Sequence, residues 1–477
     1  MTKKWWILAS VACGTFMATL DSSIVNIALP TLTKDFGVDI YQVKWVVVVY
    51  LLVITCLLLP FGRLSDQYGR KRVFQLGFLI FTIGSGLCGL SSSLGALVAA
   101  RIVQGLGVSM LMANGPAIIT AAFPFRERGA ALGTLAMVVS TGLLSGPSVG
   151  GFLISHFSWP SIFWINIPIG IAGIGLAHRF LSKDRIPVQK PPFDWIGAFL
   201  QIIFLLCFIV VFDPPNISIS GNLPLPAPRW IMAALTVIFG AAFLKVEADA
   251  KAPIFDLSLL KNTTFWSANL AGLLMFVGFS AVFVLMPFFL EEMMKFAPQQ
   301  AGLYMTAIPA TIFVVAPISG RLSDRIGSRW LAFAGALIGV LGLFLMSGIL
   351  GEGLSDSSSG IAIILGLASM GLATGLFQSP NNNAIMCSVP SEKLGVASAL
   401  LATVRNLGLV TGTGLATSLF TWRREVTGDF ISAMQLTYFI AGILMTGAIV
   451  FSLWRRGGGH HPHPEDAADP TASGAAR

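Results

Sequence analysis

The chain has 477 residues, of which 55% are hydrophobic and only 11% are charged. A soluble domain carries roughly 25% charged residues, so the composition excludes a soluble enzyme, a nucleic-acid-binding protein and a disordered chain. The net charge of +8 is therefore better explained by membrane topology than by binding to nucleic acid. The five cysteines show no CxxC or metal-ligand spacing, which indicates neither a disulfide framework nor a zinc site.

Apolar stretches of membrane-spanning length recur along the whole chain. The fourteen predicted spans are residues 5–29, 43–61, 73–92, 95–119, 130–154, 160–181, 195–212, 229–245, 265–290, 301–319, 330–350, 360–387, 396–420 and 434–454. These stretches are too long and too continuous for barrel strands. An even number of spans places both termini on one side, and most of the 30 lysines and arginines then fall on that side. The positive-inside rule identifies it as the cytoplasm.

A short motif occurs twice, each time between two predicted spans. Its first copy is Gly62-Arg-Leu-Ser-Asp66-Gln-Tyr-Gly69-Arg70-Lys-Arg72, and its second is Gly320-Arg-Leu-Ser-Asp324-Arg-Ile-Gly327. A weaker echo pairs residues 126–129 with residues 392–395. The spacing indicates two copies of a six-helix unit, an architecture in which transporters place their substrate site between the repeats.

The repeat gives a domain division for an all-α, polytopic membrane protein. Residues 1–182 and 263–456 are expected to form the two six-helix bundles, and residues 183–262 carry two inserted helices. Residues 457–477 are rich in Gly, His and Pro without an apolar face, so we predict a disordered cytoplasmic tail.

Asp21 and Arg101 are charged residues inside predicted spans. A charge at the centre of a spanning helix costs about 2.5–3.5 kcal/mol on insertion scales, so it marks function or has a partner. Counted from the outer ends of their helices, the two residues differ in depth by only about 3 Å and can therefore meet. One interpretation is a static buried ion pair. The other is a carboxylate that alternates between a paired, charged state and an unpaired, protonated state.

Arg405 is the other lone charge within a predicted span, and no acid lies obviously at its depth. Gln378 and Asn381–Asn383 are polar residues of the preceding span with which it could bond. Whether Arg405 acts in coupling or in structure stays open.

Glycines recur at four-residue spacing in the predicted span 130–154. Gly142, Gly146 and Gly150 fall on one helical face, which permits close approach of another backbone. Pro147 removes a backbone donor and is expected to bend the helix. Ordinary packing of small residues is the competing explanation.

On these motifs the sequence resembles the major facilitator superfamily, and more narrowly its fourteen-helix drug/proton antiporters of the EmrB/QacA type, over almost all of residues 5–455. The resemblance implies that Asp21 and Arg101 take part in proton coupling. It implies that the glycine face seals against the opposite half as an antiporter motif, which comprises Gly142, Gly146, Pro147, Gly150 and Gly151. It also implies a conformational latch at a cytoplasmic gate, comprising Gly62, Asp66, Gly69, Arg70, Arg72 and Asp324.

The predicted function is proton-driven antiport that exports lipophilic or amphiphilic compounds across the cell (inner or plasma) membrane by alternating access. We expect a monomer without cofactor or metal, and a periplasmic adaptor is a candidate partner. Candidate residues of the substrate cavity are Asn26, Phe279, Phe283, Met286, Gln378, Asn381 and Arg405. For the phenylalanine stripe, packing against lipid or core is the stronger alternative.

Two further observations bear on the substrate and on competing functions. The predicted span 301–319 contains no acidic residue, which favours neutral or monocationic substrates over dications. A transporter for a specific lipid, siderophore or metabolite is the alternative function, and a sensor or scaffold is a more distant one. The loops contain no HExxH or GxSxG pattern, and the P-loop pattern is absent from the sequence, which argues against an enzyme.

Overall fold

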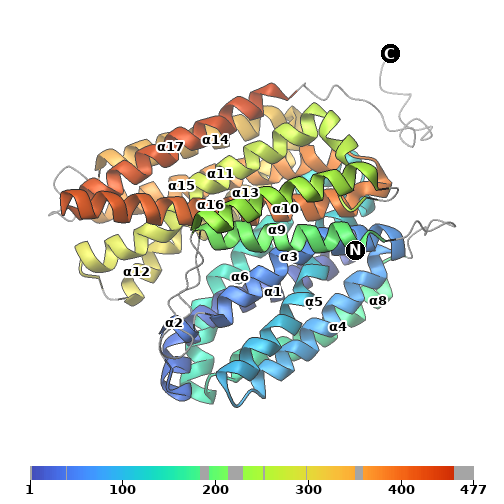
Figure 1. Cartoon of the computed structure of the whole chain (residues 1–477), viewed down its shortest axis with the longest axis horizontal. Helices are drawn as coiled ribbons and strands as arrows, with labels where there is room; N and C mark the ends of the chain where they lie inside the picture. The colour runs from blue at the N-terminus through green and yellow to red at the C-terminus, as the bar shows by residue number, and fades with distance from the viewer. Residues whose placement is uncertain are drawn as a thin grey trace.

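The computed structural model describes residues 3–38, 40–43, 45–182, 193–212, 229–250, 253–296, 298–349 and 358–455. Within these ranges every regular element is a helix, and the long helices lie roughly side by side (Figure 1). The predicted tail falls outside the described residues. The chain is a multi-pass membrane protein, since 13 helices within the described ranges are long and apolar enough to cross a membrane.

The helices follow the predicted spans closely. The first group comprises α1 (Lys3–Phe36), α2 (Ile40–Val43), α3 (Trp45–Tyr68), α4 (Arg70–Gly89), α5 (Leu94–Ala122), α6 (Arg128–Phe157), α7 (Ser161–Trp164) and α8 (Asn166–Phe180). We call this group the N-terminal half. The last group comprises α11 (Thr263–Phe288), α12 (Pro298–Met305), α13 (Ala307–Ile326), α14 (Ser328–Ile349), α15 (Ser358–Cys387), α16 (Leu394–Thr427) and α17 (Phe430–Trp454). We call it the C-terminal half.

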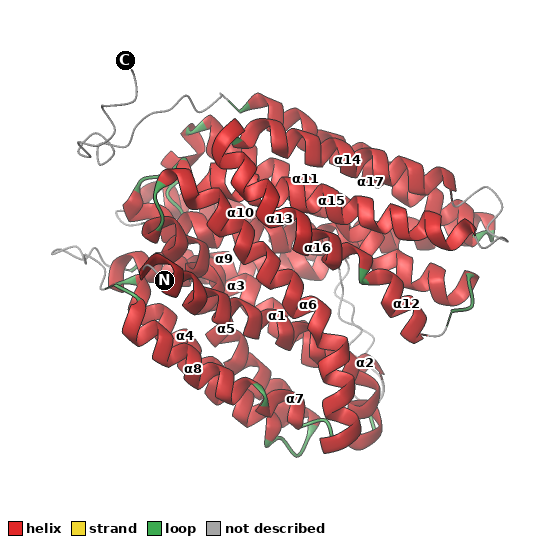
Figure 2. Ribbon diagram, turned by 180° about the vertical axis from the view of Figure 1, so that it is seen from behind, coloured by secondary structure: helices red, strands yellow, loops and turns green. Residues whose placement is uncertain are grey.

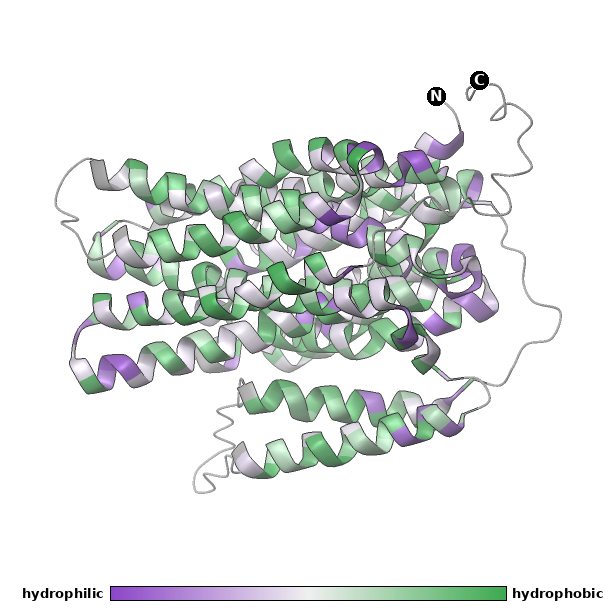
Figure 3. Cartoon of the chain, turned by 90° about the horizontal axis from the view of Figure 1, so that it is seen from above, coloured by the Kyte–Doolittle hydropathy of each residue, from purple (hydrophilic) through white to green (hydrophobic). Residues whose placement is uncertain are grey.

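Two helices connect the halves. They are α9 (Trp195–Phe212) and α10 (Arg229–Asp249), which pack against each other and which Figure 3 shows as a pair beside the main body. Helix α9 contacts both α3 and α16, so the pair rests on the seam between the halves. The apolar part of α9, Trp195–Val211, is shorter than the 13 candidate spans. It corresponds to the predicted span 195–212, so the count of fourteen spans and the domain boundaries stay predictions.

The motif that the sequence places in loops lies instead at helix ends. Gly62 to Tyr68 form the last turns of α3, and Gly69 alone separates α3 from α4. Gly69 has φ +97° and its counterpart Gly327 has φ +87°, a backbone region that favours glycine. These two residues therefore make the turns, whereas Gly62 lies within a helix.

Apolar contact between the halves is concentrated at one end of the molecule. A hydrophobic cluster there joins buried residues of the N-terminal half, such as Leu58 and Leu132, to Val396 and Leu401 of α16. The cluster around Ile24 toward the other end contains residues of the N-terminal half alone. Figures 1 and 2 show the halves together where α1 begins and diverging near α2 and α12. We call the joined end the latch end.

Candidate functional site

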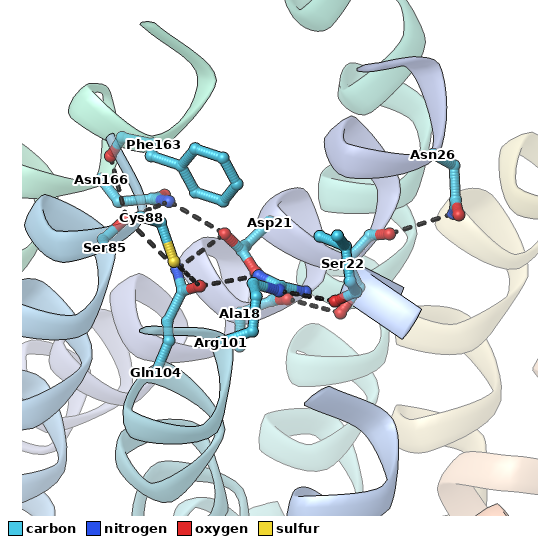
Figure 4. A network of polar contacts seen from close by, with 11 residues as sticks. Ala18, Asp21, Ser22, Asn26, Ser85, Cys88, Arg101, Gln104, Phe163 and Asn166 are labelled. Atoms are coloured by element: carbon cyan, nitrogen blue, oxygen red, sulfur yellow. Dashed lines mark hydrogen bonds and ion pairs between the residues drawn. The ribbon is translucent and has the colours of Figure 1, made fainter. Parts of the chain in front are cut away.

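Asp21 lies at the centre of a buried polar network in the N-terminal half (Figure 4). Its Oδ2 accepts a hydrogen bond from Arg101 Nη1 at 2.6 Å. Its Oδ1 accepts from Gln104 Nε2 at 2.8 Å and from Asn166 Nδ2 at 3.1 Å. Both members of the ion pair are 0% exposed. The structure thus brings together the two charges whose depths matched in the sequence, with amide donors on the second carboxylate oxygen.

The guanidinium of Arg101 is held by more than its partner acid. Its Nε donates to the carbonyl oxygen of Val46 at 3.0 Å, and Nη1 also donates to Gln104 Oε1 at 2.7 Å. Its Cζ lies 3.8 Å from the centroid of the Tyr50 ring, a cation–π contact. Nη2 is buried and has no hydrogen-bond partner among the described residues. The cation is therefore fixed in orientation and keeps one free donor.

Three polar residues of this network were not among the predicted site residues. Gln104 lies one turn from Arg101 on α5, Asn166 begins α8, and Ser85 of α4 accepts from both amides at 3.2 Å and 3.0 Å. All three are 0% exposed. Each of the three is a polar residue within an apolar run of membrane-spanning length, and this pattern could have identified it as a candidate. The pattern alone does not show which helices pack together.

The glycine face of α6 packs against α1. A Cβ built at Gly146 would lie 2.2 Å from the Oγ of Ser23 on α1, and those at Gly142 and Gly150 would also collide with α1. The expectation that this face seals against the opposite half is wrong in this conformation, because its partner belongs to the same half. At Gly151 an added Cβ would meet nothing within 4 Å. Pro147 lies within α6.

At the latch end, Asp66 joins the two halves. Its Oδ1 accepts from the backbone N–H of Gly395 and its Oδ2 from that of Val396, both at 3.0 Å. Those amides lie in the first turn of α16, where no intrahelical acceptor exists and the helix dipole favours an anion. Arg70 binds Asp66 at 3.0 Å and the carbonyl oxygen of Ser391 at 2.6 Å. The carboxylate therefore caps a helix of the opposite half.

The second copy of the motif makes the same contact in reverse. Asp324 of α13 accepts from the backbone N–H groups of Gly129 and Ala130 at 2.8 and 2.9 Å, in the first turn of α6. Asn383 contacts the same carboxylate at 3.5 Å. The weak echo at 126–129 and 392–395 thus ends in Gly129 and Gly395, each of which is one of the two backbone partners of an aspartate. Arg72 is exposed.

Both contacts need glycine on each side. A Cβ built at Gly62 would lie 2.7 Å from the carbonyl oxygen of Gly395, and one at Gly320 would lie 2.1 Å from that of Gly129. Backbones this close leave no space for a side chain. We call these paired contacts of Asp66 and Asp324 the double latch.

The predicted cavity residues do not share one surface. Gln378, Asn381 and Arg405 line the same small cavity between α11, α15 and α16. Met286 is 0% exposed in the core of the C-terminal half, whereas Phe283 is 55% exposed.

The remaining predicted cavity residues are Phe279 and Asn26. Phe279 stacks on Phe283 with ring centroids 6.2 Å apart. Asn26 is exposed and bonds the carbonyl oxygen of Ser22 within α1 (Figure 4). Three polar members of the predicted set, Gln378, Asn381 and Arg405, therefore cluster, whereas Asn26 and the apolar members lie elsewhere.

Comparison with known proteins identifies the family of the chain. The sequence model of the Major Facilitator Superfamily matches residues 11–413 and 268–475. The chain is 38% identical over 451 residues to the riboflavin transporter RibZ of Clostridioides difficile, covering 92% of this chain and 95% of that protein. It is 30% identical over 408 residues to the multidrug resistance protein Stp of Mycobacterium tuberculosis, covering 85% and 74%.

A solved structure supports the fold. The human organic anion transporter MFSD10 superposes with a TM-score of 0.69 at 15% identity, over 95% of this chain and 100% of that one, a likeness that shows the fold alone. The relatives are transporters, and no enzyme function is indicated. The chain belongs to the major facilitator superfamily.

Proposed function

We propose that the protein is a proton-coupled antiporter of the fourteen-helix EmrB/QacA type, which exports amphiphilic compounds from the cell. The observation that carries this proposal is the enclosed carboxylate of Asp21, paired at 2.6 Å with Arg101. An acid at membrane depth beside a fixed cation is suited to exchange a proton. The similarity to a multidrug resistance protein supports export of foreign compounds.

The network gives Asp21 two definable states. While it is ionised, Arg101, Gln104 and Asn166 satisfy both of its oxygens. A protonated carboxyl no longer offers Arg101 a countercharge, and the free Nη2 donor of Arg101 shows that the guanidinium has a bond to give elsewhere. We infer that protonation loosens α1 from α5, and that this loosening is linked to movement of the halves.

The double latch supplies the conformational side of the cycle. It holds the halves together at the end where α1 begins, which by the positive-inside rule faces the cytoplasm. The described form is then closed to the cytoplasm and splayed on the other side. Alternating access requires both latch contacts to break together, since each joins one half to a helix N-terminus of the other.

A dedicated transporter for one metabolite is the second candidate. The 38% identity to a riboflavin transporter favours it, and the mechanism at Asp21 would be the same. Export tests of flavins beside cationic dyes separate the two candidates. Monomeric function and a periplasmic adaptor stay predictions.

The test is transport by Asp21→Asn. We expect the variant to fold and to reach the membrane but to lose proton-driven export of amphiphilic dyes, as wild type does with a protonophore. Asp35→Asn is the matched control, because Asp35 is an exposed carboxylate on the same helix. Proton-driven export by Asp21→Asn at the wild-type rate would exclude the proposal.

A further inference from the structure

A polar cavity lies between α11, α15 and α16, away from the Asp21 network. Its polar lining consists of the carboxamides of Asn269, Gln378, Asn381 and Asn382 and the guanidinium of Arg405, and Phe276 forms an apolar wall. The free space at its centre is about 10 Å³, which is room for one water molecule. A membrane helix bundle rarely gathers so many hydrogen-bonding groups without a function.

A second arginine reaches the same lining from the end of α17. Arg455 is 2% exposed, and its Nη2 donates to Asn381 Oδ1. Its Nε and Nη1 are buried and have no hydrogen-bond partner within the described chain, and neither does the Oδ1 of Asn269. Arg405 therefore lines the cavity itself, and Arg455, which is bound to the lining residue Asn381, has two buried donors left unused.

Neither guanidinium has a countercharge. Among the residues that the structure describes, no carboxylate forms an ion pair with Arg405 or Arg455. Asp324, which Asn383 of α15 contacts, is bound to the first turn of α6. An unpaired charge away from water, such as that of the buried Arg455, is costly, and the charge of Arg405 is partly buried. Arg101 shows how this protein neutralises a buried charge elsewhere, with Asp21. The site around Arg405 therefore lacks a negative charge that a ligand can supply.

We propose that the C-terminal half contains an anion-binding site, formed by Arg405 and Arg455, that takes the carboxylate of an aromatic substrate. A planar guanidinium binds a carboxylate through two parallel hydrogen bonds. The carboxamides of Gln378 and Asn382 can donate to the same oxygens, and Phe276 can contact the ring. The inference rests on the proposed function, and it replaces the expectation of neutral or monocationic substrates with acids.

The site lies where alternating access would expose it. Asn406, next to Arg405 on α16, donates to Thr55 Oγ1 of α3 at 3.3 Å, so this part of α16 faces the opposite half. In the latched form the cavity is too small for a substrate. Separation of the halves at the latch end uncovers this face and opens the site toward the side from which an exporter loads.

Ligand-induced thermal stabilisation of the purified full-length protein tests the proposal. The probes are naphthoate and its uncharged isostere naphthamide, with chloride and inorganic phosphate as separate arms. We expect naphthoate to bind wild type about tenfold or more tightly than naphthamide, as charge-assisted hydrogen bonds require. Arg405→Gln and Arg455→Gln should each remove that preference, and Arg405→Lys should keep part of it.

Arg424→Gln is the control variant, because Arg424 lies on the same helix, is exposed and pairs with Glu292. It should bind naphthoate as wild type does. Equal affinity for the acid and the amide in wild type would overturn the proposal, even if an arginine variant failed to fold. Arginine-dependent stabilisation by chloride or phosphate, with nothing added by naphthoate, would overturn the assignment to a substrate acid.

The two proposals fail in distinguishable ways. Loss of proton coupling in Asp21→Asn should leave naphthoate binding unchanged, because Asp21 lies in the other half. Absence of the anion site would leave Asp21-dependent export of neutral or cationic dyes intact.

Discussion

Replacement of Asp66 by Ala should release one side of the double latch and open the latch end. The substitution removes the acceptors of two backbone N–H groups at 3.0 Å, those of Gly395 and Val396. It also leaves Arg70 without its ion-pair partner.

The magnitude follows from the bonds that are lost. A hydrogen bond to a charged group contributes about 1.5–3 kcal/mol, but water can reach part of this site once the halves separate. Taking about 3 kcal/mol for the pair, the ratio of latched to unlatched molecules falls on the order of 100-fold. A population that is about 99% latched would then become about half latched.

Double electron–electron resonance can measure this shift. Spin labels at Arg179 and Glu392, which are exposed on opposite halves near the latch end, would be placed in a background without the five native cysteines. Wild type should show one short distance, and Asp66→Ala should add a longer one of comparable weight. Asp66→Asn, which keeps one acceptor, should fall between. An unchanged distance distribution in Asp66→Ala would refute the latch.

Three further substitutions follow from the same contacts. Gly146→Leu should lower the free energy of unfolding by about 1–3 kcal/mol or more, because the new side chain overpacks against Ser23. Gly151→Leu should be tolerated, because an added side chain there meets nothing nearby. Equal melting temperatures for the two variants would count against the α1–α6 packing. Arg101→Lys keeps the charge but cannot reproduce the hydrogen bonds to Val46 and Gln104. Transport should therefore fall, although the variant still elutes from size-exclusion chromatography as a folded protein. Transport at the wild-type rate would show that the charge alone suffices. Burial raises the pKa of Asp256, but hydrogen bonds from Lys393 and Ser258 outweigh it and hold that pKa below its ordinary 3.8. A lowered pKa stabilises the fold above the ordinary value and loses that effect as pH falls through the folded-state value. Asp256→Asn should therefore lower the free energy of unfolding at pH 7 by about 0–1 kcal/mol, the range for a partly exposed ion pair, and by less in acid. Melting temperatures measured across this pH range test it. A loss of stability that does not depend on pH would contradict this assignment.

The fold could be predicted from the sequence because membrane helices are encoded locally. Apolar runs of sufficient length specify each span, and the repeated Asp66 and Asp324 motifs relate the halves. The turn at Gly69 also follows from the residue type. The role of Gly62 could not be assigned in this way, because the sequence does not distinguish a glycine that permits a turn from one that permits close contact between helices.

The partners of each site residue were less predictable. Depth matching found Asp21 with Arg101, since both lie on long helices whose ends the hydropathy fixes. Asn166 lies near the start of a short helix, and nothing local shows that it reaches Asp21. Likewise, the spacing of Gly142 and Gly146 shows that a helix approaches closely but does not identify α1 as that helix. Which face meets which neighbour is decided by tertiary packing.

The most direct measurement is proton release on substrate binding, made with purified protein in weakly buffered solution. If Asp21 exchanges a proton for substrate, addition of a transported amphiphile should acidify the medium with wild type and with Asp35→Asn, but not with Asp21→Asn. Equal acidification by Asp21→Asn, at matched substrate occupancy, would show that the proton is carried elsewhere.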